Sequence, residues 1–386
     1  MNVKVFIRKY TMIIALVVVF VLFAILTGGR LLVPQNLSNL LLQNAYVLIM
    51  ACGMLMCILT GGNVDLSVGS TVCLVGAVAA QLMAAGIHPL IAIPLCIVIA
   101  AVIGIWQGFW IGYIHVPPFI CTLAGMFLFR GLGRAILGSK TVAINDPTFL
   151  NIFASYINLP GIDDGEVKWS AFIAGCIVAV VLIIHKYVSR NAKMKKGYKL
   201  DSAVSEFGKI AIIDVLILAY TWQIAHFRGI SVMALWVVAV VLIYEFITSK
   251  SAFGRYFYAV GGNEKAAKLS GIDTKKVYFA AYTSMSILAG LSGLIIAARI
   301  GSVNGDTGSS FEMDAIGACF IGGASAYGGS GNVVGIIVGA ILLGIINQGM
   351  SIIGLDNNWQ YMVKGAVLLI AVIFDVVSNR KTGKAG

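Results

Sequence analysis

The sequence has few charged residues. Asp, Glu, Lys and Arg make up 11% of its 386 residues, whereas hydrophobic residues make up 59%. An ordinary soluble domain carries about 25% charged residues, so this composition excludes a water-soluble fold. No polar linker divides the chain into compact halves. We therefore expect residues 1–386 to form a single transmembrane domain.

The sequence also lacks the motifs of nucleotide-hydrolysing enzymes and of metal sites. It contains no P-loop for nucleotide phosphates, no HExxH zinc motif and no GxSxG nucleophile motif. Any ATP hydrolysis that the protein uses must therefore come from another polypeptide. We expect no catalytic residue, no cofactor and no metal in this chain.

Paired cysteines are absent as well. The seven cysteines all lie in apolar segments, none belongs to a CxxC pair, and their number is odd. This pattern predicts small core residues and neither disulfides nor metal ligands.

The sequence does contain many apolar runs of about 20 residues, the length of helix that crosses a hydrocarbon core of roughly 30 Å. Barrel strands would alternate over roughly ten residues instead, so we predict an all-α polytopic membrane protein with twelve transmembrane helices. Two runs are short and rich in glycine, which is typical of broken or re-entrant helices, and ten spans are the alternative. The predicted spans are 11–27, 38–60, 67–85, 89–114, 119–138, 169–185, 210–226, 230–248, 277–299, 314–328, 332–353 and 359–378, of which 67–85 and 314–328 are the short ones.

The positive charge predicts an orientation. The formal net charge is +11, and most Lys and Arg residues lie in four stretches, 1–10, 186–209, 249–276 and the tail after 378. Cytoplasmic loops are enriched in Lys and Arg, so these stretches and both termini are expected in the cytoplasm. We interpret 186–209 as a basic cytoplasmic insertion that contacts the lipid bilayer. The acidic loop 139–168 is expected outside, and we expect no nucleic acid as a partner.

A polar interruption at 60–70 contains Asp65 and Ser67. A carboxylate at membrane depth is costly unless it is paired or hydrated. These two residues are expected to cap the next helix or brace the loop, or else to contact a transported solute, because broken helices often line transport paths. Isolated polar residues inside the spans are further pathway candidates: Asn44, Gln107, Asp214, Glu245, Asn347, Gln348 and Lys364.

The segment 258–272 predicts a short cytoplasmic helix. Asn263 can cap it, Glu264 and Lys268 oppose the helix dipole, and Gly271 can end it. Such a helix is either surface decoration or a docking element for a soluble partner.

Glycines predict where helices pack closely. They recur every four residues along one face of two spans, and each face is expected to contact a neighbouring helix, most simply inside one subunit. A further run of glycines, near Asp314, predicts a turn buried in protein, because unsatisfied backbone cannot face lipid. The two repeats are Gly104, Gly108 and Gly112, and Gly331, Gly335 and Gly339, and the run near Asp314 spans 322–331.

Together these segments resemble the permease subunits of bacterial ABC importers for monosaccharides, the ribose, galactose and xylose group. The run GGNVDLSVGS at 61–70 is similar to the family's DLSVG signature, and YAVGGNEKAAKLSGI at 258–272 is similar to its cytoplasmic signature. Further similarity lies at 116–131, 313–323 and 358–372. The run WQGFW at 106–110 and the insertion most resemble the xylose and multiple-monosaccharide branch.

The resemblance implies a homodimer in the bacterial cytoplasmic membrane that imports xylose or a related pentose or hexose. It also implies two separate ATPase subunits and an extracytoplasmic sugar-binding protein as partners. The loop 249–276 would couple the permease to the ATPases, while the loop around Asp65 would brace or gate the pathway. The implied coupling residues are Gly261, Gly262, Asn263, Glu264, Ala266 and Ala267; the candidates for the gate or pathway are Asn63, Asp65, Ser67, Asn44, Gln107, Trp110 and Phe119.

The same polar residues are also compatible with two other functions. An ion-coupled secondary transporter would use Asp65 or Asp314 as a proton or sodium site. The alternative of an intramembrane protease is supported only by the scattered aspartates, and it requires cleavage activity without partners. Uptake driven by an ion gradient, by this polypeptide alone, would separate the first alternative from the ATP-driven importer.

Overall fold

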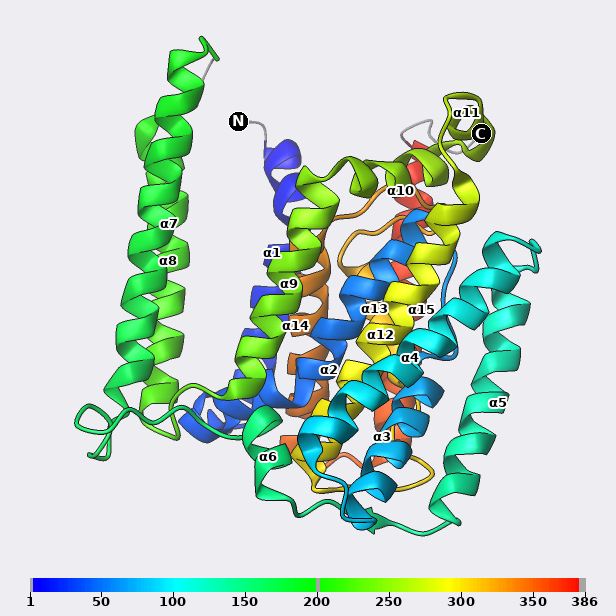
Figure 1. Cartoon of the computed structure of the whole chain (residues 1–386). Coiled ribbons are helices and arrows are strands. Elements are labelled where there is room, and N and C mark those ends of the chain that lie inside the picture. The colour runs from blue at the N-terminus through cyan, green and yellow to red at the C-terminus, as the bar shows by residue number, and fades with distance from the viewer. Residues whose placement is uncertain (1–2, 199–201, 382–386) are drawn as a thin grey trace.

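The computed structural model describes residues 3–198 and 202–381, and it is built almost entirely of helices (Figure 1). This confirms the predicted all-α class. The elements are α1 (Val3–Leu26), η1 (Arg30–Leu32), α2 (Pro34–Leu59), α3 (Val68–Ala84), α4 (Pro89–Gly112), α5 (Pro118–Leu137), β1 (Val142–Ala143), α6 (Pro147–Phe153), α7 (Trp169–Lys195), α8 (Ala203–Ala225), α9 (Val232–Lys250), α10 (Ala252–Gly262), α11 (Glu264–Leu269), α12 (Thr274–Ile300), β2 (Ser302–Val303), α13 (Phe311–Ile321), α14 (Val333–Ile353) and α15 (Asn357–Lys381).

Every predicted span contains a helix, but the helices differ in length. Within the described residues, nine are long and apolar enough to cross a membrane. Helices α3 and α13 have 17 and 11 residues, about 26 Å and 17 Å of helix. The two runs predicted to be broken therefore form short helices, and α13 ends at Ile321, seven residues before the expected end of its span.

The two short helices meet at their beginnings. A Cβ atom built on Gly69 would lie 2.2 Å from the carbonyl oxygen of Gly308, just before α13. Only a residue without a side chain permits this approach. The first turn of α3 therefore packs directly on the backbone that leads into α13.

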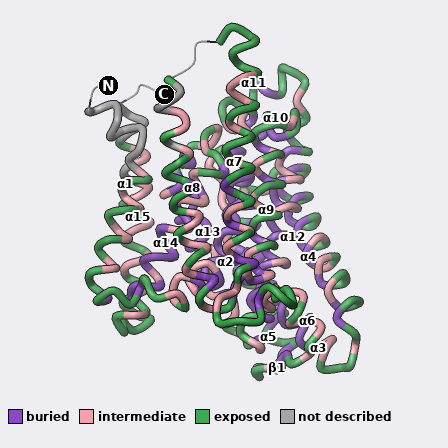
Figure 2. Tube along the Cα trace, turned by 90° about the vertical axis from the view of Figure 1, so that its left-hand side faces the viewer, coloured by how far each residue is buried: buried purple, intermediate pink, exposed green. Residues whose placement is uncertain are grey.

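The core lies around α2 and α12. Most of α2 is buried, and α12 is buried along much of its length; Figure 2 shows this concentration of buried residues in the middle of the bundle, with α15 more exposed at its edge. A helix that is apolar on all sides is suited to such a position. Cβ atoms on Gly104, Gly108 and Gly112 would clash with Thr283, Phe279 and Lys275 of α12, which confirms close packing inside one subunit.

Helices α7 and α8 form an antiparallel pair that stands beside the bundle (Figure 1). Helix α7 continues to Lys195, ten residues beyond the end predicted for its span. Much of the 186–209 segment is therefore helix. Glu206 of α8 forms ion pairs with Lys186 and Arg190 of α7, which ties the two helices together beyond the apolar span.

The two ends of the bundle carry different elements (Figure 1). Helices α10 and α11 lie at one end, where α1 begins and α15 ends; we call it the α10–α11 end. At the opposite end, β1 pairs with β2 in an antiparallel ladder, and α6 lies beside it; we call it the ladder end. None of β1, β2, α6 and α10 was predicted from the sequence.

Candidate gate and coupling site

The α10–α11 segment forms the helix that the sequence predicts at 258–272, preceded by a second one. The Ser251 hydroxyl caps α10 by accepting a hydrogen bond from Gly254 N at 2.8 Å. The Asn263 side chain then caps α11, accepting from Ala266 N at 2.9 Å, and Gly271 follows its end with φ +84°. The predicted cap at Asn263 and the predicted stop at Gly271 are both confirmed. Helix α11 therefore ends just before α12 begins.

Helix α11 presents one buried and several exposed side chains. Ala267 is buried against the bundle, whereas Asn263, Glu264 and Ala266 are exposed. Leu269, its last residue, is 90% exposed. Leu269 therefore leaves an apolar surface uncovered at this end. Burying this side chain would contribute roughly 1.5–3 kcal/mol.

Three glycine pairs meet where α10 ends, and we call residues 61–62, 261–262 and 328–329 the glycine junction. A Cβ atom on Gly261 would lie 1.7 Å from the carbonyl oxygen of Leu59 and 2.5 Å from Gly329 N. Gly329 N donates a 3.1 Å hydrogen bond to that same Leu59 oxygen. Backbone thus contacts backbone between α10, the end of α2 and the loop from α13 to α14.

A tyrosine adds a polar link near the junction. The Tyr258 hydroxyl of α10 donates to Gly331 O at 3.0 Å. Burial raises the pKa of Tyr258, and the charge of Glu245 raises it further. The hydroxyl therefore keeps its proton and remains a hydrogen-bond donor.

Asp65 is fully buried in the break between α2 and α3. Its Oδ1 accepts hydrogen bonds from Ser67 N at 2.8 Å and from Ser67 Oγ at 2.7 Å. The Ser67 hydroxyl also accepts from Gln107 Nε2 at 2.7 Å, and Ser286 Oγ donates to Gln107 Oε1 at 3.3 Å. The chain of contacts joins the break to α4 and α12, so Asp65 braces the loop in this conformation.

Helix capping by Ser67, one of the expected roles, is wrong. Ser67 occupies the position before α3, but its side chain makes no capping hydrogen bond to that helix. Its hydroxyl is instead engaged with Asp65 and Gln107. The second oxygen of Asp65, Oδ2, has no hydrogen-bond partner within the described residues.

The other pathway candidates occupy three different environments. Asn44 is buried and donates from Nδ2 to Ala340 O of α14. Asn63 lines a cavity of about 160 Å³ together with Glu264. Trp110 and Phe119 lie on the outer surface, 37% and 58% exposed. Contact of these residues with a solute remains a prediction.

Asp314 forms a second buried polar centre, whose partners the sequence did not reveal. It accepts a 2.7 Å hydrogen bond from the Tyr46 hydroxyl of α2, and Lys364 Nζ of α15 lies 3.0 Å from it. The Tyr46 ring stacks on Phe311 with centroids 3.7 Å apart. A carboxylate within the apolar bundle indicated that some partner must exist, but not which one.

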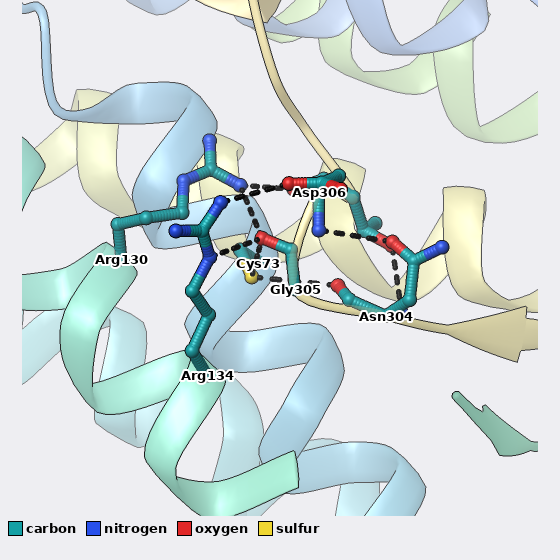
Figure 3. Close-up of polar contacts among 7 residues, drawn as sticks. Cys73, Arg130, Arg134, Asn304, Gly305 and Asp306 are labelled. Atoms are coloured by element: carbon teal, nitrogen blue, oxygen red, sulfur yellow. Dashed lines mark hydrogen bonds and ion pairs between the residues drawn. The ribbon is translucent and has the colours of Figure 1, made fainter. Parts of the chain in front are cut away.

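Two arginines hold a loop near the ladder end, and neither is among the predicted site residues. Arg130 and Arg134 lie one turn apart on α5 and point toward the loop after β2 (Figure 3). Arg130 Nη1 donates to Thr307 O at 2.6 Å, and Arg134 Nη2 pairs with Asp306 Oδ1 at 2.8 Å. The loop forms one wall of a cavity of about 330 Å³. Their four-residue spacing, which places both on one helical face, was the available signal.

The cysteines have the environment that the sequence predicts. All seven lie within the described residues and are free, and six of them are buried. The described residues contain no group of three or more His, Cys, Asp and Glu side chains that is suited to a metal ion.

The sequence of the chain is similar to those of transport permeases. A family model described as "Branched-chain amino acid transport system / permease component" matches residues 36–372. The chain is 34% identical over 375 residues to the xylose transport system permease protein XylH of Haemophilus influenzae, which covers 97% of each chain. It is 34% identical over 379 residues to XylH of Escherichia coli K12, covering 97% of this chain and 93% of that one.

A ribose permease is also similar. The ribose import permease protein RbsC of Escherichia coli K12 is 30% identical over 372 residues, covering 96% of this chain and 95% of that protein. No solved structure matches the chain.

Proposed function

The chain belongs to the family of branched-chain amino acid transport system permease components, and on that premise we propose that it is the membrane subunit of an ATP-driven importer for a monosaccharide. Its substrate is xylose or a related pentose or hexose, because the relatives described above are xylose and ribose permeases. The family predicted from the DLSVG and GGNEKAA motifs is thereby confirmed. The protein is a multi-pass membrane protein.

The proposal is supported chiefly by the exposed apolar and basic side chains of α11. Leu269 exposes 90% of its surface on a helix that belongs to none of the apolar spans. Lys265 and Lys268 beside it are exposed too. A soluble partner with an apolar pocket and acidic groups at its rim would cover this surface, and a separate ATPase subunit is the partner that this class of transport requires.

The orientation follows from the distribution of charge. The basic stretch 249–276 contains α10 and α11, and basic loops face the cytoplasm. The α10–α11 end therefore faces the cytoplasm of a bacterial inner membrane, with the beginning of α1 and the end of α15 on the same side. The ladder end faces outward, where a sugar-binding protein delivers its ligand.

Transport proceeds through movement of the gate, without tight binding of sugar by the permease. ATP-driven closure of two ATPase subunits displaces α10 and α11, and the glycine junction passes this displacement to the break between α2 and α3. We assign Trp110 and Phe119 to the wall of a pathway between two copies of the chain, an assignment with which their exposure on one copy is compatible. The buried Asp65 network then braces the loop behind that wall.

The test is sugar uptake by reconstituted vesicles. The chain is inserted into proteoliposomes with its ATPase subunits and binding protein, and uptake of radiolabelled xylose and ribose is measured with and without ATP. We expect uptake only with ATP and with all partners present. Uptake by this polypeptide alone, driven by a proton or sodium gradient, would contradict the proposal and favour an ion-coupled transporter.

A further inference from the structure

We propose that Tyr278 is a positioning residue that makes the movement of α11 reversible, by holding this helix to the end of α2 when the ATPase subunits separate. The inference rests on the proposed function. The Tyr278 hydroxyl lies 3.0 Å from Thr60 O and 3.2 Å from Glu264 Oε2. One side chain of α12 thus bridges α11 and Thr60, the residue that follows α2.

The bridge continues into the break that follows α2. Thr60 is fixed to α2, because its hydroxyl donates to Cys57 O at 2.7 Å. Asn63 Nδ2 donates in turn to the Thr60 hydroxyl at 3.3 Å. Polar contacts therefore connect Glu264 to Tyr278, Tyr278 to Thr60, and Thr60 to the loop that contains Asp65.

This bridge resists a different movement from the one that the glycine junction resists. Backbone atoms in van der Waals contact, such as Gly261 against Leu59, resist being pushed together but offer little resistance to separation. A hydrogen bond, in contrast, also resists separation. The glycine contacts transmit the inward push of the ATPases. In the return movement, the hydrogen bond from Tyr258 to Gly331 O holds α10, and the contacts of Tyr278 hold α11.

The geometry also leaves room for the bridge to change. A tyrosine hydroxyl has one hydrogen to donate, so Thr60 O and Glu264 Oε2 share it in a three-centre hydrogen bond. Asn63, Glu264 and Tyr278 line a cavity of about 160 Å³, and residues 115–118 line it as well. Protein interiors are close-packed, and this space allows the Glu264 side chain to move relative to Tyr278 without a clash.

The experiment measures coupling as sugar imported per ATP hydrolysed, in proteoliposomes that contain the permease, its ATPase subunits and the binding protein. Tyr278→Phe removes the bridging hydroxyl and nothing else. We expect ATP hydrolysis to continue while radiolabelled xylose imported per ATP falls about threefold to tenfold, the effect of losing one or two hydrogen bonds on an equilibrium. A defect limited to stability would lower ATP hydrolysis and xylose uptake together and would leave xylose imported per ATP unchanged.

Two comparisons make the test specific. Tyr282→Phe removes another buried hydroxyl one turn along α12, and this hydroxyl has no hydrogen-bond partner within the described residues, so the ratio should stay at the wild-type value. Glu264→Gln keeps an oxygen that accepts from Tyr278 and should preserve the ratio, whereas Glu264→Ala should lower it as Tyr278→Phe does.

The outcomes separate the bridge from the proposed function. A wild-type ratio for Tyr278→Phe, an equal loss for Tyr282→Phe, or an equal loss for Glu264→Gln and Glu264→Ala would overturn the role of Tyr278 while leaving the importer intact. Failure of the wild-type complex to import sugar with ATP would overturn the proposed function, and the role of Tyr278 with it.

Discussion

Lys364 holds both carboxylate oxygens of Asp314. Its Nζ lies 3.0 Å from Oδ1 and 3.0 Å from Oδ2, while Asp314 is almost fully buried. The ion pair attaches α15 to the short helix α13. No described residue in the apolar window of α15 is fully buried. Val363, Val367 and Leu368 pack partly buried against the core, and the ion pair adds a polar contact to this packing.

Lys364→Met should therefore destabilise the protein. Breaking a buried ion pair leaves an uncompensated charge and costs about 3–5 kcal/mol, and we expect about 3 kcal/mol because Lys364 is partly exposed. Thermal unfolding of the purified protein in detergent measures the loss. The double variant Asp314→Asn with Lys364→Met removes both charges and should recover much of it; equal stability of Lys364→Met and the wild type would contradict the role of the pair.

The buried brace around Asp65 predicts a difference between two neighbouring serines. Ser67→Ala removes a donor to Asp65 and the acceptor of Gln107, and should cost about 1–3 kcal/mol of unfolding free energy, the penalty for unsatisfied buried groups. Ser70 is equally buried, but its hydroxyl has no hydrogen-bond partner within the described residues. Ser70→Ala is therefore the matched control and should be nearly neutral; equal losses would argue against the brace.

The glycine junction predicts a contrast between adjacent glycines. Gly261→Ala places a Cβ atom 1.7 Å from Leu59 O, whereas Gly262→Ala meets nothing within 4 Å. The first substitution must displace α10 from the end of α2, and it should lower ATP-driven xylose uptake about fivefold or more, since overpacking costs about 1–3 kcal/mol. Gly262→Ala should retain uptake. Full activity of Gly261→Ala would show that this contact is dispensable.

The loop before α7 predicts a dependence of stability on pH. Burial alone would raise the pKa of Asp163, but hydrogen bonds from Leu159 N and Ser170, with the charge of Lys168, lower it below its ordinary value of 3.8. A carboxyl group with a lowered folded-state pKa stabilises the fold above its unfolded pKa, and this contribution disappears as pH falls through the folded value.

Asp163→Asn tests that dependence. The wild type should unfold at a higher temperature than the variant at neutral pH, because only the charged carboxylate accepts both backbone hydrogen bonds, from Leu159 N and Ser170 N. The difference in unfolding temperature should shrink as the pH falls below about 3.8. A difference that is constant with pH would exclude the carboxylate as its cause.

The sequence predicted the features that depend on local patterns. Apolar runs located the spans, and the cap at Asn263 with the stop at Gly271 located α11, because a helix signals its ends through nearby residues. The boundary of α7 was missed, since charged residues such as Arg190 continue a helix as readily as apolar ones do. Helix formation in 186–195 depends on propensity and not on hydrophobicity.

Contacts between distant segments were beyond prediction. Asp314 and Lys364 are 50 residues apart, and each was noticed only as a polar residue in an apolar run. The glycine junction joins three segments whose glycines indicated turns but not their partners. Tyr278 gave no signal at all, because an aromatic residue near a helix start is ordinary, and its importance arises only from where Thr60 and Glu264 lie.

The central claim is that a separate ATPase binds α11 and drives the gate from that side, and binding of the purified ATPase subunits to vesicles containing this chain tests it most directly. We expect the wild type and Leu269→Met to bind alike. Leu269→Glu should bind about tenfold more weakly or worse, as for loss of an apolar anchor, with unchanged unfolding temperature. Equal binding by Leu269→Glu, or no binding by the wild type, would contradict the account.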